Sequence, residues 1–205
     1  MRITVFGASG SVGDWLVPEA LRRGHEVVAV TRQRSRITTQ HPNLSIMEAD
    51  LDDIAALEKT LTGSHAAIIS LADPVVHTGT RSIVTAMRTA GTSRVEALTG
   101  FGTSAISRRQ LNPLMRAVVA TLRVITLPSF RAKEDQDAIL RASGLTFTIV
   151  QPPTLTTGSA TGTYRHGDYR GKSILGNLSR ADLATFMLDN LEQDRYLNQS
   201  AYVQQ

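Results

Sequence analysis

The chain contains no cysteine among its 205 residues. This absence excludes disulfide bonds, thiolate nucleophiles, and zinc or iron–sulfur sites that depend on cysteine ligands. The five histidines show no paired spacing of the kind that metal sites use, so we expect no metal. The sequence also lacks a basic stripe with interleaved aromatic residues, and we therefore expect no nucleic-acid partner.

Long apolar runs are missing as well. No uncharged apolar stretch reaches the roughly 18 residues of a membrane-spanning helix. The first apolar run, Ile3–Phe6, is too short for the apolar core of a signal peptide. We expect a cytoplasmic protein without a membrane partner.

Lysine is scarce, because arginine supplies all but three of the 22 basic residues. The formal net charge is +4. Arginine suits phosphate and carboxylate ligands through its planar fork of donors, although a solvated arginine surface is an equally simple explanation of the composition.

The residues that are present predict one globular domain. Hydrophobic residues make up 41% of the chain and charged residues 20%. Six short apolar or β-branched runs alternate with helical segments, which is typical of a doubly wound, mostly parallel α/β (Rossmann) sheet with helices on both faces. The expected strands are 3–6, 26–31, 44–47, 66–71, 94–98 and 146–150, with a short last strand at 201–203. The expected helices are 11–23, 53–61, 76–89, 131–142 and a helix from Ser179 to Leu191.

Residues 103–129 interrupt this alternation and predict a helical, lid-like insertion. Asn112-Pro113 is typical of a helix start, and Pro128 is expected to end the segment. Between the two prolines, six apolar residues at helical spacing predict one apolar face that covers the sheet: Leu114, Met115, Val118, Val119, Leu122 and Ile125.

A glycine loop follows the first expected strand. Its sequence is Gly7-Ala8-Ser9-Gly10-Ser11-Val12-Gly13, and a helix follows directly. A strand, a glycine loop and a helix at the start of a βαβ unit direct backbone N–H groups at a pyrophosphate. We expect Gly7, Ser9, Gly10, Ser11, Val12 and Gly13 to bind a dinucleotide; the alternative is a tight turn that needs glycine only for packing.

The end of the second strand carries arginine instead of a carboxylate. A carboxylate there would bind the ribose hydroxyls of NAD and repel a 2′-phosphate, whereas arginine favours NADP. We expect Arg32 and Arg36, with the Ser35 hydroxyl, to bind that phosphate, so the predicted cofactor is NADP(H). Asp50-Leu51 follows the third strand and is expected beside the adenine, although Asp50 could instead cap the next helix.

These motifs resemble the atypical short-chain dehydrogenase/reductases with an NAD(P)H-binding, NmrA-like fold. Within them, the chain is similar to the branch of biliverdin IXβ reductases and NADPH-dependent flavin reductases. The likeness extends over nearly the whole chain and rests on the glycine loop, Arg32, Ser35-Arg36, Ala49-Asp50-Leu51, Arg81–Val84, Ala86-Met87, Ser143-Gly144-Leu145, Gln151-Pro152-Pro153, Ser179–Leu183 and Phe186–Leu188.

The resemblance implies further positions at the site. Ser70, Leu71 and Ala72 would pass the cofactor, and Pro152 would lie beside the nicotinamide. The substrate would lie over that ring, near Gly100, Phe101 and Thr154, where this chain departs from the serine and histidine of the family's reductase branch. Phe101 would either stack on a planar substrate or fill the core.

The proton-donating pair Tyr-x-x-x-Lys of the main superfamily branch is absent, because no tyrosine has a lysine four residues later. This disfavours alcohol–ketone interconversion. Lys133 is the candidate catalytic residue: it shares a helix face with Leu140 and would point toward the sheet. The alternative is a solvated ion pair between Lys133 and Asp137.

Two functions follow from these features. The first is an NADPH-dependent reductase that transfers hydride to a flavin, a quinone or a linear tetrapyrrole, in a monomer or small homo-oligomer. The alternative is a non-catalytic regulatory protein that senses NADP(H). A third, sugar epimerisation, would need a larger substrate domain.

Overall fold

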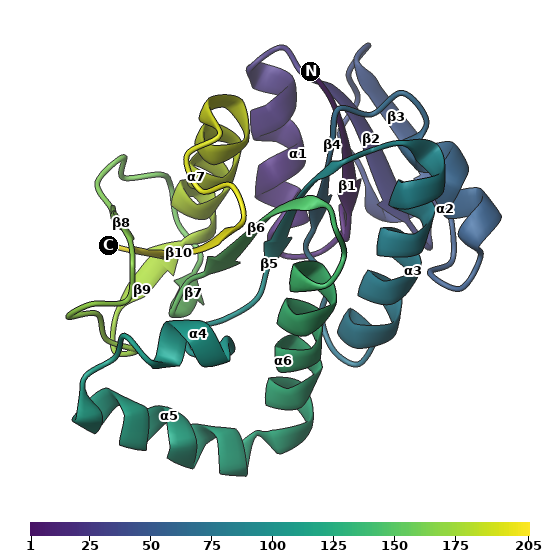
Figure 1. Ribbon diagram of the computed structural model, residues 1–205. Coiled ribbons are helices and arrows are strands. Elements are labelled where there is room, and N and C mark those ends of the chain that lie inside the picture. The colour runs from purple at the N-terminus through teal and green to yellow at the C-terminus, as the bar shows by residue number, and fades with distance from the viewer.

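An eight-stranded sheet runs through the centre of the computed structural model, which describes residues 1–205 (Figure 1). The strand order is β3-β2-β1-β4-β5-β6-β10-β8. Every neighbouring pair is parallel except β10 with β8, so the mostly parallel sheet is confirmed. The strands are β1 (Arg2–Phe6), β2 (Glu26–Thr31), β3 (Leu44–Glu48), β4 (Ala66–Ile69), β5 (Arg94–Leu98), β6 (Thr146–Gln151), β8 (Arg165–Gly167) and β10 (Gln199–Gln204).

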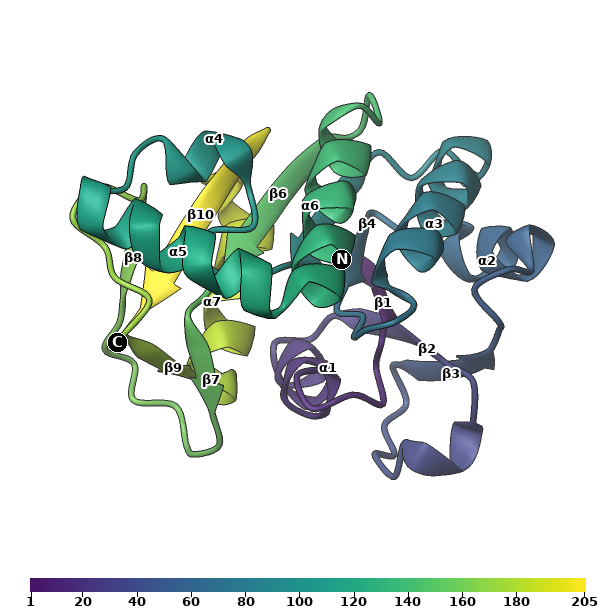
Figure 2. The ribbon, with the colours of Figure 1, turned by 90° about the horizontal axis from the view of Figure 1, so that it is seen from below.

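Helices cover both faces of the sheet, as Figures 1 and 2 show. On one face, α1 (Gly13–Arg22) packs beside α7 (Arg180–Gln193); on the other lie α2 (Ile54–Leu61), α3 (Val76–Ala90) and α6 (Leu127–Arg141). Because both faces are covered, residues of either parity along the central strands are buried, and they divide between two hydrophobic clusters of 22 and 17 residues. The single doubly wound domain is therefore confirmed.

The helix ends follow local capping rules. The Asp53 carboxylate accepts a hydrogen bond from the Ala56 N–H at 2.9 Å and starts α2, so Asp50 does not cap this helix. The Ser179 hydroxyl accepts from the Asp182 N–H at 3.0 Å and starts α7. Helix α3 ends at Gly91, whose φ of +75° is readily adopted by glycine.

The insertion forms α4 (Ala105–Arg108) and α5 (Pro113–Ile125), and Asn112 caps α5 as expected, accepting from the Met115 N–H at 2.9 Å. The expected stop at Pro128 is confirmed, because α5 ends at Ile125, but the expected start of the next helix at 131 was wrong. Pro128 lies in the first turn of α6, where a missing N–H costs nothing. The chain therefore passes from α5 into α6 through a bend of 113°.

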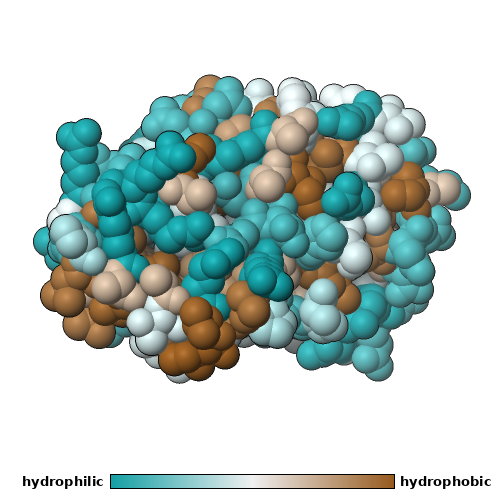
Figure 3. All heavy atoms as spheres, turned by 60° about the horizontal axis from the view of Figure 1, so that its bottom comes forward, coloured by the Kyte–Doolittle hydropathy of each residue, from teal (hydrophilic) through white to brown (hydrophobic).

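The predicted single apolar face of α5 was also wrong in part. Met115 and Val119 are buried, but Leu114 and Ile125 are 70% and 71% exposed. At 100° per residue these two pairs lie on different sides of the helix, because the apolar residues span too wide an arc for one contact surface. Figure 3, which brings this side of the molecule forward, shows hydrophobic side chains gathered on the surface beside hydrophilic ones.

Several short elements were not predicted. Strands β7 (Thr154–Thr156) and β9 (Asn177–Ser179) form a separate two-stranded parallel sheet, and a 3₁₀ turn, η1 (Arg34–Arg36), follows β2. No single helix has both the length and the apolar character to cross a membrane; α5 and α6 pass such a test only when taken together across their bend.

Candidate functional site

The glycine loop lies between the end of β1 and the start of α1. Gly7 has a φ of +83°, and a Cβ at this position would lie 2.1 Å from the Ser70 carbonyl oxygen. A Cβ at Gly13 would lie 2.3 Å from the Ala8 carbonyl oxygen. Glycine at both positions therefore lets β1 approach the turn after β4 and lets α1 begin directly against the loop.

The loop leaves backbone donors free at the helix start. The Gly10 N–H bonds the Gly7 carbonyl at 3.0 Å, whereas the N–H groups of Ser9, Ser11 and Val12 have no backbone acceptor. No side chain caps α1. Free N–H groups and the positive end of a helix dipole suit a pyrophosphate.

A cleft of about 400 Å³ opens beside this loop, at the carboxyl ends of β1, β2 and β4. In doubly wound sheets this edge binds ligands where the strand order reverses, which here is between β1 and β4. The structure brings nine of the predicted cofactor residues to the cleft: Gly7, Ser9, Gly10, Arg32, Arg36, Leu51, Ser70, Leu71 and Ala72.

The remaining predicted cofactor residues lie elsewhere. Ser11, Val12 and Gly13 stand at the start of α1, where their side chains do not line the cleft. Asp50 is exposed, and only Leu51 of that pair reaches the cleft. Ser35 lines a different hollow, which it shares with Arg34, because in the η1 turn its side chain points about 120° away from that of Arg36.

Arg32 and Arg36 both line a hollow of about 320 Å³ that adjoins the cleft. Ser9, Thr31 and Gln33 complete its lining, and no carboxylate lines it. The Ser9 and Thr31 hydroxyls are 3.0 Å apart and join the glycine loop to the end of β2. Neither arginine forms an ion pair with the protein. The hollow thus offers two guanidinium groups to an anion.

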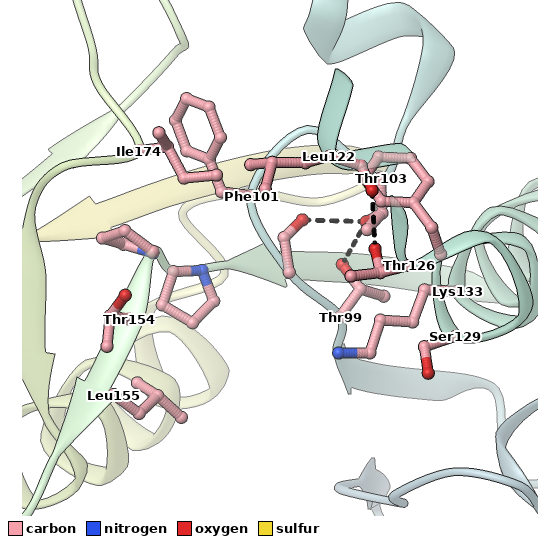
Figure 4. Close-up of a pocket in the computed structure, with 14 residues that line it drawn as sticks. Thr99, Phe101, Thr103, Leu122, Thr126, Ser129, Lys133, Thr154, Leu155 and Ile174 are labelled. Carbon is pink, nitrogen blue, oxygen red and sulfur yellow. Dashed lines mark hydrogen bonds between the residues drawn. The ribbon is translucent and has the colours of Figure 1, made fainter. Parts of the chain in front are cut away.

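A second cavity, of about 390 Å³, lies at the carboxyl ends of β5 and β6 and beneath the insertion (Figure 4). It brings together five predicted residues from three separate parts of the chain: Gly100, Phe101, Lys133, Pro152 and Thr154. The insertion and α6 contribute lining residues that the sequence did not indicate, namely Leu122, Thr126, Ser129 and Phe130. Thr99, Thr103, Pro153, Leu155 and Ile174 complete it.

Lys133 is the only charged residue that lines this cavity. The predicted alternative, an ion pair with Asp137, is wrong: Asp137 binds Arg141 at 2.8 Å, and Glu134 binds Arg108 at 2.7 Å. The Lys133 side chain extends from α6 into the cavity (Figure 4), where its Nζ would lie 3.7 Å from a Cβ at position 100. Glu134 and Asp137 are therefore engaged with arginines, and Lys133 forms no ion pair, so its ammonium is available to a ligand.

Phe101 belongs mainly to the core. It is 5% exposed and packs against Tyr169 and Tyr202, with ring centroids 5.1 and 5.6 Å away. The Phe101 N–H also donates to the Pro152 carbonyl at 3.0 Å, which ties the loops after β5 and β6 together. The Phe101 ring therefore fills the core, as the second of the two predicted alternatives states, and it reaches the cavity only with its edge.

The two tyrosines behind Phe101 do not line the cavity. The Tyr169 hydroxyl donates to the Gln151 carbonyl at 3.4 Å, and burial raises the pKa of Tyr169 well above its ordinary value. Burial likewise raises the pKa of Tyr202 to about 12. Neither hydroxyl is placed to exchange a proton with a substrate.

Thr99 and Thr103 are two of the hydroxyl-bearing residues that line the cavity. Thr103 donates to the Gly100 carbonyl at 2.8 Å and lies 3.2 Å from the Thr99 hydroxyl (Figure 4). The Gln151 side chain donates to Thr103 at 3.2 Å and accepts from Ser107 at 2.8 Å. This network fixes the loop after β5 against β6, because each buried polar group finds a partner.

The glycine loop, the free amides and the cleft at the switch point define a dinucleotide-binding Rossmann protein. The chain belongs to the NAD(P)H-binding family, whose model matches residues 7–194. A relative of nearly the same length is the uncharacterised protein YwnB of Bacillus subtilis, 25% identical over 97% of this chain and 96% of that protein.

Solved structures share the fold over nearly the whole chain. A proposed epimerase from Bacteroides thetaiotaomicron matches with a TM-score of 0.84 at 25% identity, covering 99% of this chain and 96% of that one. A short-chain dehydrogenase/reductase from Veillonella parvula, in complex with NADP, matches with a TM-score of 0.81 at 18% identity, over 100% and 94% of the two chains. ChuY, an anaerobilin reductase from Escherichia coli O157:H7, matches with a TM-score of 0.80 at 22% identity, over 99% and 96%.

Proposed function

We propose that this protein is an NADPH-dependent reductase whose acceptor is a planar conjugated molecule: a flavin, a quinone or a linear tetrapyrrole. The observation that carries the proposal is the Lys133 ammonium, the single charge in a cavity next to the dinucleotide cleft. A fold relative with tetrapyrrole reductase activity, the anaerobilin reductase ChuY, supports the choice of acceptor class.

The dinucleotide would span the carboxyl edge of the sheet. Its pyrophosphate would meet the amides at the start of α1, and Arg32 with Arg36 would bind the 2′-phosphate of NADP. The complex of the Veillonella relative with NADP supports this cofactor choice. The nicotinamide end would then reach Pro152, which lines the second cavity.

Bound NADPH supplies a hydride, that is two electrons with one hydrogen, to the acceptor. Lys133 would hold the negative charge that the reduced acceptor gains, until water supplies the proton. The apolar walls, Leu122, Phe130 and Leu155, would cover the ring faces and limit access of water. Such a reaction needs no tyrosine as a proton donor. This agrees with the hydroxyls of Tyr169 and Tyr202, which both donate hydrogen bonds to backbone carbonyls.

The test is NADPH oxidation at 340 nm with FMN, riboflavin, a soluble quinone and biliverdin offered separately. We expect turnover with at least one acceptor. Lys133→Met should lower kcat/KM by roughly 100- to 1,000-fold, as loss of one charge-stabilising donor does. Lys59→Met removes an exposed lysine on α2 and should leave the rate unchanged. Tight NADPH binding with no turnover on any acceptor would refute the proposal and favour the NADP(H)-sensing alternative.

A further inference from the structure

A separate hollow of about 480 Å³ lies on the insertion, between α4 and α5. Four of its six lining residues are arginines: Arg108, Arg109, Arg116 and Arg123. Ala105 and Ala120 complete the lining and leave space between the longer side chains. None of these six residues lines the dinucleotide cleft or the cavity beside it.

Internal contacts hold three of the four guanidinium groups in place. Arg116 donates through Nε to the Leu111 carbonyl at 2.9 Å and through Nη2 to the Arg109 carbonyl. Arg108 donates to the Gly102 carbonyl at 2.6 Å and lies over the Phe130 ring, 5.8 Å from its centroid. Arg123 donates to both carboxylate oxygens of Glu134. Side chains fixed in this way lose little conformational entropy when a ligand arrives.

The charge of the hollow is poorly balanced. No carboxylate lines it, and Glu134 alone pairs with Arg108 and Arg123. Arg109 and Arg116 have no ion pair with any acid of the protein. Four cations close together repel one another, and an oxyanion with two or more charges relieves that repulsion while accepting charge-assisted hydrogen bonds.

We propose that this hollow is a second anion site, which binds the phosphate group of a small molecule outside the dinucleotide cleft. Its volume falls in the range of about 300–1,000 Å³ that small-molecule sites occupy, so the ligand is larger than a bare ion. The site does not depend on the proposed reductase activity, because it is defined by binding alone. The phosphate belongs either to the acceptor bound in the neighbouring cavity or to a separate metabolite.

The test is calorimetric titration of the NADP⁺-saturated protein with inorganic pyrophosphate, with chloride of equal ionic strength as the reference. Saturation fills the dinucleotide cleft, so a remaining single site reports on the hollow. Arg109→Gln should weaken binding about tenfold or more, as loss of a charged hydrogen-bonding partner does. Arg109 makes no side-chain contact that folding requires, and Arg131→Gln, an exposed arginine of α6 outside the hollow, is the matched control.

Absence of pyrophosphate binding after saturation would overturn the proposal. Equal weakening by Arg109→Gln and Arg131→Gln would overturn it too, because diffuse surface attraction would explain both. The source of the phosphate follows from competition. If FMN displaces pyrophosphate and riboflavin does not, the hollow holds the acceptor's phosphate; if neither displaces it, the ligand is a separate phosphorylated metabolite. Each of these binding results stands whether or not NADPH is turned over.

Discussion

Gly7→Ala is the sharpest perturbation of the cofactor cleft. The new Cβ would lie 2.1 Å from the Ser70 carbonyl oxygen, whereas ordinary contacts begin near 3.4 Å, so the turn after β4 must move away from β1. That movement stretches the hydrogen bond from the Ser70 N–H to the Phe6 carbonyl, which is 3.0 Å long. The φ of +83° adds left-handed strain for any residue with a Cβ.

The expected cost combines these effects. Left-handed strain contributes about 1–2 kcal/mol, overpacking about 1–3 kcal/mol, and the weakened hydrogen bond about 0.5–1.5 kcal/mol. The total of about 2.5–6.5 kcal/mol corresponds to a fall in Tm of roughly 5–26 °C for a chain of this length. The same movement displaces the cleft wall, so NADPH binding should be lost together with the stability.

Gly24→Ala is the matched control, because Gly24 has a φ of +81° and nothing within 4 Å of a Cβ. It should show only the strain, a fall in Tm of roughly 2–8 °C, and should bind NADPH normally. Thermal unfolding and a fluorescence titration with NADPH measure both effects. Equal destabilisation by the two substitutions, or normal NADPH binding by Gly7→Ala, would refute the close approach of β1 to the Ser70 turn.

Three further outcomes follow from the structure. Arg32→Gln should weaken NADPH binding by roughly 10- to 100-fold and leave NADH binding nearly unchanged in the same titration. An equal loss of affinity for both cofactors would show that Arg32 does not bind the 2′-phosphate. Gly100→Leu should raise KM for the acceptor more than it changes the Kd of NADPH, because its side chain would extend from a Cβ 3.7 Å from Lys133 Nζ; an unchanged KM would place the acceptor elsewhere. Burial raises the pKa of the fully buried Glu96 carboxyl to about 8. Because this value lies above the ordinary 4.5, the carboxyl ionises on unfolding between about pH 4.5 and 8, and the free energy of unfolding falls as pH rises through that window. Glu96→Gln should therefore match the wild type most closely near pH 5 and gain relative stability toward pH 8, and a pH-independent difference in unfolding free energy would contradict this.

Most residues of the cofactor cleft could be predicted from the sequence, because the motifs that indicate them are local. A strand, three glycines at fixed spacing and the arginine at the end of the next strand lie within 32 residues of the N-terminus. Ser35 was placed less well, because a 3₁₀ turn sends neighbouring side chains in different directions. Such a turn has no strong sequence signature.

The second cavity was harder to predict. The resemblance indicated Gly100 and Thr154, and helical spacing from Leu140 turned Lys133 inward, but no local pattern indicated Thr126 or Ile174. These residues reach the cavity because the insertion bends sharply into α6 and the segment before β9 folds back toward it, which depends on tertiary packing. The apolar spacing of α5 was misleading for a related reason: its apolar residues span too wide an arc for one contact surface, and tertiary packing decides which part of that arc is buried.

The most direct measurement is a crystal structure of the protein with NADPH bound. The proposed function predicts the pyrophosphate at the start of α1, the 2′-phosphate between Arg32 and Arg36, and nicotinamide C4 facing the cavity that holds Lys133. A nicotinamide whose C4 is covered by protein, with no path to that cavity, would contradict hydride transfer at this site.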